Sequence, residues 1–252
     1  MTTPPAEPPV AAAPDPPAAR RTWLRRLAAL RLRRAEWVFV VALTGFAALA
    51  ILAHLYAYFG WDVATAHALQ RAPVPGLFTF MRAVSSFGNA WHPFALTTAT
   101  ALALLARARR TEAAGLVLSA GGGSLVNTIV KLVVARPRPA AALVSVYRPL
   151  LTKSFPSGHV TFYVCYFGFL FFAAYAVLPP RTWARRLALT ATALPVATVG
   201  LSRVYLGAHW PSDTLGAYLL SGLWLACAVH LYRRWKERST LHPEDKPGVS
   251  VR

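Results

Sequence analysis

The chain contains six apolar segments, each long enough to cross a lipid bilayer, and this limits its possible folds more than any other feature. A spanning helix needs about 17–25 mostly apolar residues. The segments lie at about 37–59, 88–106, 113–135, 160–178, 187–206 and 214–232. Because backbone groups inside lipid must be hydrogen-bonded within the protein, we expect an all-α integral membrane bundle of six transmembrane helices.

The composition supports a membrane protein. Of the 252 residues, 56% are hydrophobic and only 14% are charged, whereas soluble domains carry about 25% charged residues. The net charge of +18 is compatible with nucleic-acid binding, but the basic residues cluster beside the apolar segments, so we expect no nucleic-acid partner. Cys165 and Cys227 lie inside apolar segments, which predicts neither a disulfide nor a cysteine metal site.

The remaining segments define the expected domain organisation. Residues 1–34 form a tail whose first part, 1–19, is rich in Pro and Ala and is expected to be disordered. Its second part, 20–34, carries seven arginines and fits an amphipathic helix on the membrane surface or a basic linker equally well. The six-span domain covers 35–235, and 236–252 form a polar tail.

The distribution of basic residues predicts the orientation in the membrane. With six spans, both termini lie on one side, together with the loops near 107–112 and 179–186. Those regions hold 19 of the 27 Lys and Arg residues. The positive-inside rule therefore places both termini in the cytoplasm of a multi-pass cell-membrane protein.

Two basic residues stand at the end of the third segment. Lys131 and Arg138 are nearly two helical turns apart, so they share a face if the helix persists. Basic side chains at a helix end can also simply extend to the interface, and Arg136 is a good candidate for that role. Phosphate binding is favoured because other anion-binding residues are expected on the same side.

The tetrapeptide Pro156-Ser157-Gly158-His159 stands immediately before the aromatic-rich fourth segment. Ser157 is a natural N-cap residue, and Gly158 allows a ligand to approach the backbone closely. Free N–H groups at a helix start bind anions, and His159 falls in that first turn. An ordinary capped helix start is the alternative interpretation.

The third cluster joins the last two segments. Arg203 offers a planar fork that matches phosphate oxygens. Pro211 suits the first turn of the sixth helix, so Asp213 can reach back to His209. A carboxylate at one ring nitrogen fixes the tautomer and leaves the other nitrogen free to attack. An Arg–Asp ion pair with a capped helix is the structural alternative.

Two other runs favour structural roles. The small residues 121–124 predict close packing between helices in the membrane rather than a phosphate loop, because no Gly-Lys-Ser/Thr ending follows. The turn at 85–88 lies on the same side as the three clusters. We interpret it as a simple loop, with lining of the site entrance as the alternative.

The three clusters resemble, in order and spacing, the signature motifs of the type-2 phosphatidic acid phosphatase superfamily, which also includes bacterial acid phosphatases and vanadium haloperoxidases. The motifs read Lys131-x6-Arg138-Pro139, Pro156-Ser157-Gly158-His159 and Ser202-Arg203-x5-His209-x3-Asp213. The resemblance covers about 37–235, and its specific part about 131–213. Two arginines, Arg136 and Arg138, precede prolines here, and the family spacing selects Arg138.

The resemblance implies a role for each matched residue. His209 is the nucleophile that forms a phosphohistidine, Asp213 orients it, and His159 protonates the leaving oxygen and then activates water. The residues that hold the phosphate oxygens are Lys131, Arg138, Ser157, Gly158 and Arg203. No cofactor or metal is expected, since three cationic side chains can take the place of a metal and no carboxylate cluster suits Mg²⁺.

These inferences predict a metal-independent membrane phosphatase with its site on the extracytoplasmic side. Its substrate would be a lipid phosphate or diphosphate, such as undecaprenyl diphosphate, phosphatidic acid or phosphatidylglycerophosphate, and its partners would be membrane lipids. The alternatives are a lipid phosphotransferase of the same fold and a non-catalytic lipid-binding protein. A vanadium haloperoxidase is disfavoured because those relatives are typically soluble.

Overall fold

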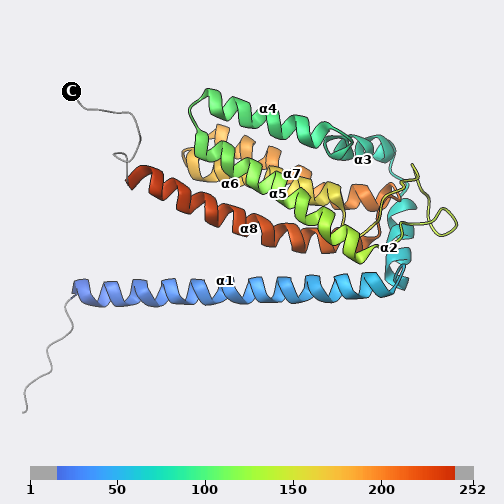
Figure 1. Ribbon diagram of the computed structural model, residues 1–252, viewed down its shortest axis with the longest axis horizontal. Coiled ribbons are helices and arrows are strands. Elements are labelled where there is room, and N and C mark those ends of the chain that lie inside the picture. Colours follow the sequence, from blue (N-terminus) through green and yellow to red (C-terminus); the bar gives the residue numbers. More distant parts are fainter. Residues whose placement is uncertain (1–15, 242–252) are drawn as a thin grey trace, which may run out of the picture. The chain divides into compact units, whose positions relative to one another are not determined.

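The protein is described by a computed structural model over residues 16–241, and every regular element in that range is a helix, which confirms the all-α fold (Figure 1). The elements are α1 (Pro16–Leu55), α2 (Gly60–Gln70), α3 (Leu77–Ser85), the 3-10 helix η1 (Ser86–Gly88), α4 (His92–Ala106), α5 (Arg110–Val134), α6 (Gly158–Val177), α7 (Trp183–Tyr205) and α8 (Pro211–Leu241).

Five of the described helices are long and apolar enough to span a membrane, over Arg33–Leu55, Arg110–Val134, Gly158–Val177, Trp183–Tyr205 and Pro211–Arg238. The second of the six expected spans, 88–106, is shorter than predicted. Its helix begins only at His92, because η1 and a turn take up the preceding residues and Pro93 stands in the first helical turn. The chain is a multi-pass membrane protein.

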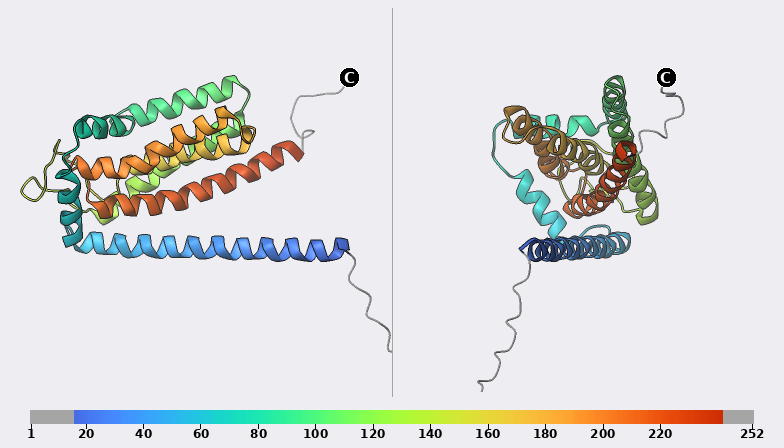
Figure 2. Two further views of the ribbon diagram at one scale, coloured as in Figure 1. Left: turned by 180° about the vertical axis from the view of Figure 1, so that it is seen from behind. Right: turned by 90° about the vertical axis from the view of Figure 1, so that its left-hand side faces the viewer.

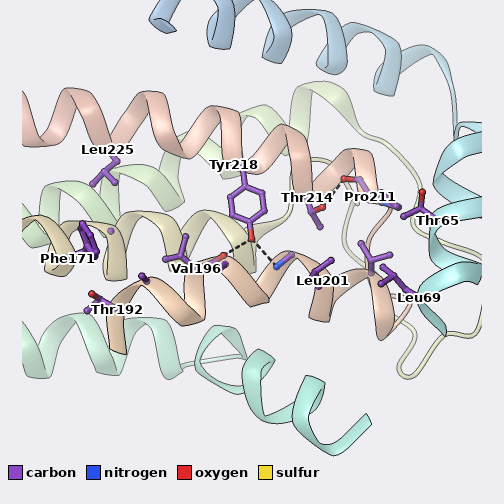
Figure 3. Close-up of a pocket in the computed structure, with 15 residues that line it drawn as sticks. Thr65, Leu69, Phe171, Thr192, Val196, Leu201, Pro211, Thr214, Tyr218 and Leu225 are labelled. Atoms are coloured by element: carbon purple, nitrogen blue, oxygen red, sulfur yellow. Dashed lines mark hydrogen bonds between the residues drawn. The ribbon is translucent and has the colours of Figure 1, made fainter. Parts of the chain in front are cut away.

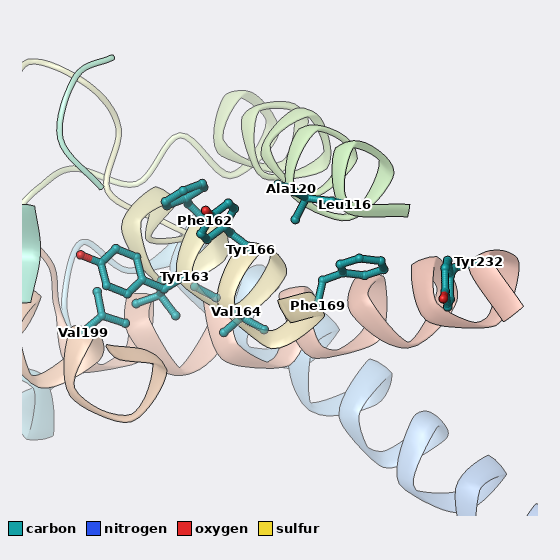
Figure 4. Close-up of a cluster of buried hydrophobic side chains, with 11 residues drawn as sticks. Leu116, Ala120, Phe162, Tyr163, Val164, Tyr166, Phe169, Val199 and Tyr232 are labelled. Carbon is teal, nitrogen blue, oxygen red and sulfur yellow. The ribbon is translucent and has the colours of Figure 1, made fainter. Parts of the chain in front are cut away.

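Helix α6 is the centre of the bundle, with α5, α7 and α8 packed around it (Figure 2). Its aromatic side chains, including Tyr163, Tyr166 and Phe169, are buried against Leu116 of α5 and Val199 of α7, as Figure 4 shows. The aromatic run expected at the fourth span therefore serves as the interior of the bundle.

The glycine run in α5 permits the close helix packing that the sequence predicts. A Cβ atom added at Gly123 would lie 2.5 Å from Cys165 Sγ of α6 and 3.2 Å from Trp224 Cδ1 of α8. No larger residue fits there without displacing a neighbouring helix. The two cysteines are both free thiols.

Helix α7 contains Pro195 and continues through it. One turn later, the hydroxyl of Tyr218 from α8 lies between two backbone groups of α7. It donates to Val196 O at 2.6 Å and accepts from Gly200 N at 3.2 Å. Tyr218 thus connects α8 to the part of α7 that follows Pro195. It also lines an apolar groove of about 680 Å³ between α6, α7 and α8 (Figure 3).

One end of the bundle carries α2, α3 and the loop 135–157 (Figure 1). The segment from Gly60 to Gly88 forms α2, α3 and η1. The loop is fixed to α2, because His67 Nε2 bonds Leu143 O at 2.7 Å and Gln70 Nε2 donates to Ser145 O at 2.8 Å. The end of the bundle that carries the three clusters is therefore an ordered structure.

The terminal segments differ in part from the expectation. Helix α1 begins at Pro16, so 16–19 are helical rather than disordered, and the expected boundary at 34/35 falls inside one continuous helix. Helix α8 extends to Leu241, six residues into the expected polar tail 236–252. Residues 1–15, the rest of the segment expected to be disordered, and 242–252, the rest of the expected polar tail, lie outside the described residues. The domain boundaries stay predictions.

Candidate active site

The three sequence clusters meet at one end of the bundle, where α5 and α7 end and α6 and α8 begin. Lys131 comes from α5, His159 from α6 and Arg203 from α7, while Arg138 and His209 lie in the connecting loops. The topology alone predicted that these segments would end on one side. Hydrogen bonds and ion pairs within the cluster show how closely they approach.

His209 lies between a cation and a carboxylate, and its side chain is buried. Its Nε2 atom is 3.1 Å from Arg138 Nη1, and its Nδ1 atom is 3.5 Å from Asp213 Oδ2. The second distance is longer than that of an ordinary hydrogen bond, and Nδ1 has no hydrogen-bond partner among the described residues. Catalytic hydrogen bonds are often long before substrate binds, so this geometry suits a histidine that Asp213 orients through Nδ1.

The ionisation of His209 follows from its surroundings. Burial holds the pKa of His209 well below its usual range, and the positive charges of Arg138, Lys131 and Arg203 lower this pKa further. The imidazole is therefore neutral near pH 7, which is the form that has a free electron pair for attack.

Asp213 is fully buried and held by groups from three directions. Its Oδ1 accepts from Arg136 Nη1 at 2.7 Å, and its Oδ2 accepts from the Ser154 hydroxyl and from Trp210 N, the latter at 2.9 Å. Asp213 is the third residue of α8, and its bond to Trp210 N, the backbone group that precedes the helix, is a common N-terminal capping interaction. Asp213 thus caps the N-terminus of α8 and also faces His209.

Arg136 does not extend to the interface as expected; it is 1% exposed. Its Nη2 pairs with Asp62 Oδ2 at 3.0 Å, in addition to its bond with Asp213. Ser212 joins the same network, because it donates from its backbone N and its hydroxyl to Asp62 at 2.9 and 2.8 Å. The expectation was wrong because two carboxylates supply buried partners that the local sequence does not show.

Arg203 is anchored by the turn at 85–88, which we had interpreted as a simple loop. Its Nη1 donates to Ser85 Oγ at 2.8 Å, and Ser202 Oγ donates to the same oxygen at 3.0 Å. Arg203 is 6% exposed, and its Nε has no partner among the described residues. The turn therefore holds the guanidinium through Nη1, and the Nε–H remains as one donor for a ligand.

His159 is positioned by the same segment. Its Nε2 lies 2.9 Å from Asn89 Oδ1, and since an amide oxygen only accepts, this nitrogen carries the hydrogen. Gly88 lies against the imidazole, because a Cβ atom there would come within 2.7 Å of His159 Cγ. Only glycine leaves room for the ring at this position.

Ser157 is the residue before α6, as expected, but its side chain makes no capping hydrogen bond. The hydroxyl is completely buried and has no partner among the described residues. A buried polar atom without a partner is costly, and Gly158 beside it is exposed. The start of α6 is therefore suited to bind an anion, with the Ser157 hydroxyl as one donor.

The two basic residues of the first cluster are held by the carbonyls of the loop before α6. Lys131 Nζ donates to Lys153 O at 3.0 Å, and Arg138 Nε donates to Thr152 O at 2.7 Å. Arg138 is the arginine that contacts His209, as the family spacing indicated. Arg136 lies behind Asp213, so the two arginines of the doubled motif have separate positions.

The site can thus bind a tetrahedral anion beside a neutral, oriented imidazole. Sequence reasoning missed Asp62, Ser85, Asn89, Arg136 and Ser154 as parts of it. Among residues 16–241, no three His, Cys, Asp or Glu side chains are grouped as metal ligands.

The fold and these residues define an integral membrane protein in which two histidines, a buried carboxylate and several basic side chains gather at one end of a helical bundle. A family model described as the PAP2 superfamily matches residues 112–237, half of the chain. The chain belongs to the PAP2 superfamily. Asp62, Ser85 and Asn89 lie outside the matched residues.

Curated relatives are lipid phosphatases of several kinds. The chain is 34% identical over 109 residues to a lipid A 1-phosphatase of Rhizobium etli (38% of this chain, 42% of the relative). It is 31% identical over 108 residues to phosphatidylglycerophosphatase B of Bacillus subtilis (42% and 50%). It is 34% identical over 148 residues to decaprenylphosphoryl-5-phosphoribose phosphatase of Mycolicibacterium smegmatis (56% and 71%). The first two matches therefore span half or less of each relative.

Solved structures show the same fold. A transmembrane PAP2-type phosphatidylglycerolphosphate phosphatase from Bacillus subtilis superposes with a TM-score of 0.67 at 24% identity, covering 80% of this chain and 97% of that chain. LpxE of Aquifex aeolicus gives a TM-score of 0.51 at 21% identity, covering 70% and 96%.

Proposed function

We propose that this protein hydrolyses a lipid phosphate or diphosphate through a phosphohistidine intermediate. The observation that carries the proposal is the position of His209, with Nε2 3.1 Å from Arg138 and Nδ1 3.5 Å from Asp213. A neutral ring nitrogen beside cationic side chains that can hold a phosphate is the arrangement that attack on phosphorus requires. Covalent catalysis divides one difficult step into two easier ones.

In the first step, His209 Nε2 attacks phosphorus. The N–P bond forms as the P–O bond to the lipid breaks, and the leaving oxygen takes a proton from His159. The phosphate oxygens are held by Lys131, Arg138 and Arg203, with the Ser157 hydroxyl and the backbone at Gly158. Because phosphoryl transfer depends mainly on positioning and charge stabilisation, this set of donors supplies most of the catalysis.

In the second step, water attacks the phosphohistidine. His159, now neutral, takes a proton from this water, the N–P bond breaks, and inorganic phosphate leaves. His209 is then neutral again. Asp213 stabilises the positive charge that develops on His209 in the first attack and that the phosphohistidine carries until the second, since its carboxylate faces Nδ1.

The proposed setting is the outer face of the membrane, with both termini in the cytoplasm, as the distribution of Lys and Arg indicates. The site lies at the ends of spanning helices, so a phosphate can enter it while the lipid chains stay in the bilayer. We propose no dependence on a metal, because Lys131, Arg138 and Arg203 supply the positive charge.

The substrate is a lipid of the kinds on which the relatives act, or undecaprenyl diphosphate or phosphatidic acid. The relatives are named for three different headgroups, so they favour the reaction more than any one lipid. A phosphotransferase of the same fold would pass the phosphate to another lipid. A non-catalytic lipid-binding protein has no need of His159, His209 and Asp213 in these positions.

The test uses the purified full chain in detergent with several lipid phosphates, with and without EDTA. Phosphate release should survive EDTA and should be inhibited by vanadate, which mimics a five-coordinate phosphorus. His209→Ala should abolish release and the alkali-stable, acid-labile label from ³²P-substrate. His230→Ala, a matched exposed histidine of α8, should change neither. Turnover by His209→Ala at the wild-type rate would overturn the mechanism.

A further inference from the structure

A large cavity adjoins Arg203, one of the proposed phosphate-binding residues. A cavity of about 740 Å³ reaches Arg203, Ser85 and Asn89 on the side of the proposed chemistry. Ligand pockets in proteins usually measure about 300–1,000 Å³. The space is therefore large enough for a whole headgroup, and a single phosphate would leave most of it empty.

The same cavity is also lined by two more arginines, Arg82 of α3 and Arg148 of the loop 135–157. The two guanidinium groups lie against one ring, because their Cζ atoms are 5.3 and 5.7 Å from the centroid of Tyr147. A cation over an aromatic face is attracted to the ring. Tyr147 thus brings the two positively charged guanidinium groups close to each other.

Neither arginine has a carboxylate partner among the described residues. Between Glu36 and Glu237 the chain has only three acidic residues, Asp62, Glu112 and Asp213. Arg136 occupies Asp62 and Asp213, and Lys236 pairs with Glu112. Because no carboxylate within residues 16–241 forms an ion pair with Arg82 or Arg148, an anion in the cavity would be attracted by both of their charges.

Arg148 also lies next to the other phosphate-binding arginine. A neighbouring cavity of about 170 Å³ reaches Arg138, and the two cavities share Arg148, Leu150 and Ala208. Arg148 therefore lines one cavity with Arg203 and another with Arg138, the two arginines that hold the attacked phosphate in the proposed function. A group joined to that phosphate would meet it.

We propose that Arg82 and Arg148 bind a second phosphate that stays on the leaving group of the substrate. This inference rests on the proposed function and narrows it. The favoured class is a lipid diphosphate, or a lipid whose terminal phosphate is carried by a headgroup with its own phosphodiester. A phosphatidic acid, whose leaving alcohol is neutral, makes no use of these two arginines.

The experiment measures kcat/KM for two matched pairs of substrates in neutral detergent. One pair is phosphatidylglycerophosphate and phosphatidic acid with the same acyl chains, and the other is a prenyl diphosphate and its monophosphate. The wild type should favour the two-phosphate member of at least one pair. Arg82→Gln and Arg148→Gln should each lower that preference about tenfold or more, since a hydrogen bond to a charged group contributes about 1.5–3 kcal/mol.

Arg71→Gln is the matched control. Arg71 is an exposed arginine at the end of α2 that lines a different cavity, so its loss should leave both preferences unchanged. Anionic lipid headgroups share the chemistry of the second phosphate. The assays are therefore repeated with phosphatidylglycerol added to the micelles. If the two arginines bind only bulk anionic lipid and not the substrate's second phosphate, neither substitution should change the preferences in neutral detergent.

The outcomes separate the two proposals. An active wild type whose preferences are the same in Arg82→Gln and Arg148→Gln overturns the second phosphate site and leaves the phosphatase intact. The same holds if the substitutions act only when phosphatidylglycerol is present. A wild type inactive on all four substrates counts against the proposed function itself.

Discussion

The guanidinium of Arg136 lies 2.7 Å from Asp213, Nη1 to Oδ1, with both side chains fully withdrawn from the surface. Asp62 accepts from the other side of the same guanidinium. A buried charge is tolerated only when it is paired, and here one cation holds two carboxylates. Asp62 of α2 thereby fixes, through Arg136, the carboxylate that faces His209.

We expect Asp62→Asn to lower kcat about 10²-fold while KM changes less than about twofold. The amide keeps the shape of the carboxylate but removes its charge, so Arg136 moves and Asp213 loses its orientation. A displacement of about 1 Å at a reacting group can cost this much in rate. Asp62 has no contact with the phosphate-binding residues, so substrate affinity should be spared. Steady-state kinetics on the purified variant measure both constants.

Removing one partner of a buried pair also costs about 3–5 kcal/mol of stability, so folded protein must be measured in parallel. Arg136→Lys keeps a positive charge but cannot bridge two carboxylates, and it should show the same loss of kcat. A purely structural role would lower the yield of folded protein and leave kcat per folded molecule unchanged. That result would contradict the relay through Arg136.

Asn89 should set the efficiency of His159. Asn89→Ala removes the oxygen that lies 2.9 Å from His159 Nε2, so the ring loses its fixed orientation. We expect kcat to fall about 10–100-fold, within the range of general acid–base contributions, with substrates that have poor leaving groups affected most. An activated aryl phosphate, whose leaving oxygen needs no proton, serves as the comparison. Equal losses on both substrates would show that Asn89 does not act through the proton that His159 gives to the leaving oxygen.

Lys131→Ala should raise KM and lower kcat together, because the ammonium group attracts the phosphate both before and during transfer. Each constant should change about tenfold or more, the scale of one charged hydrogen bond. Lys153→Ala is the matched control, since Lys153 interacts with Lys131 only through its backbone oxygen. An unaltered KM in Lys131→Ala would remove this residue from the phosphate site.

The sequence predicts much of the site because its motifs combine short spacing with helix ends. His209 and Asp213 are four residues apart at the start of a helix, so local geometry brings them near each other. The ends of the apolar segments place Lys131, His159 and Arg203 on one side. The fourth, fifth and sixth segments were located to within a few residues of α6, α7 and the start of α8.

The supporting residues could not be predicted in this way. Asp62 and Arg136 are separated by 74 residues in the sequence, and Asn89 and His159 by 70. Their contacts depend on how α2 and the turn before α4 pack on the bundle, which no local pattern specifies. The proline-flanked Arg136 resembles an interfacial arginine until its buried carboxylate partners are known. The start of α4 shifted for a similar reason, since η1 interrupts an apolar run.

The acidic limb of the pH profile should depend on Arg138. Burial, followed by the charges of Arg138, Lys131 and Arg203, holds the pKa of His209 below its usual value of about 6.5. A lowered pKa keeps the imidazole neutral to a lower pH, so the acidic limb of kcat/KM set by His209 should lie below that value. Arg138→Gln removes one positive charge and raises the pKa of His209, so this limb should shift to higher pH.

The profiles of wild type, Arg138→Gln and Arg71→Gln should be measured with one substrate, so that ionisation of the substrate phosphate is common to all three. Since kcat/KM reports ionisations of the free enzyme and free substrate, a difference in the limb then belongs to the protein. Arg138→Gln should also lose activity at its optimum, because Arg138 binds the phosphate. Only the position of the acidic limb tests the effect of Arg138 on His209. If this limb stays in place or moves to lower pH, the charge of Arg138 does not control the ionisation of His209.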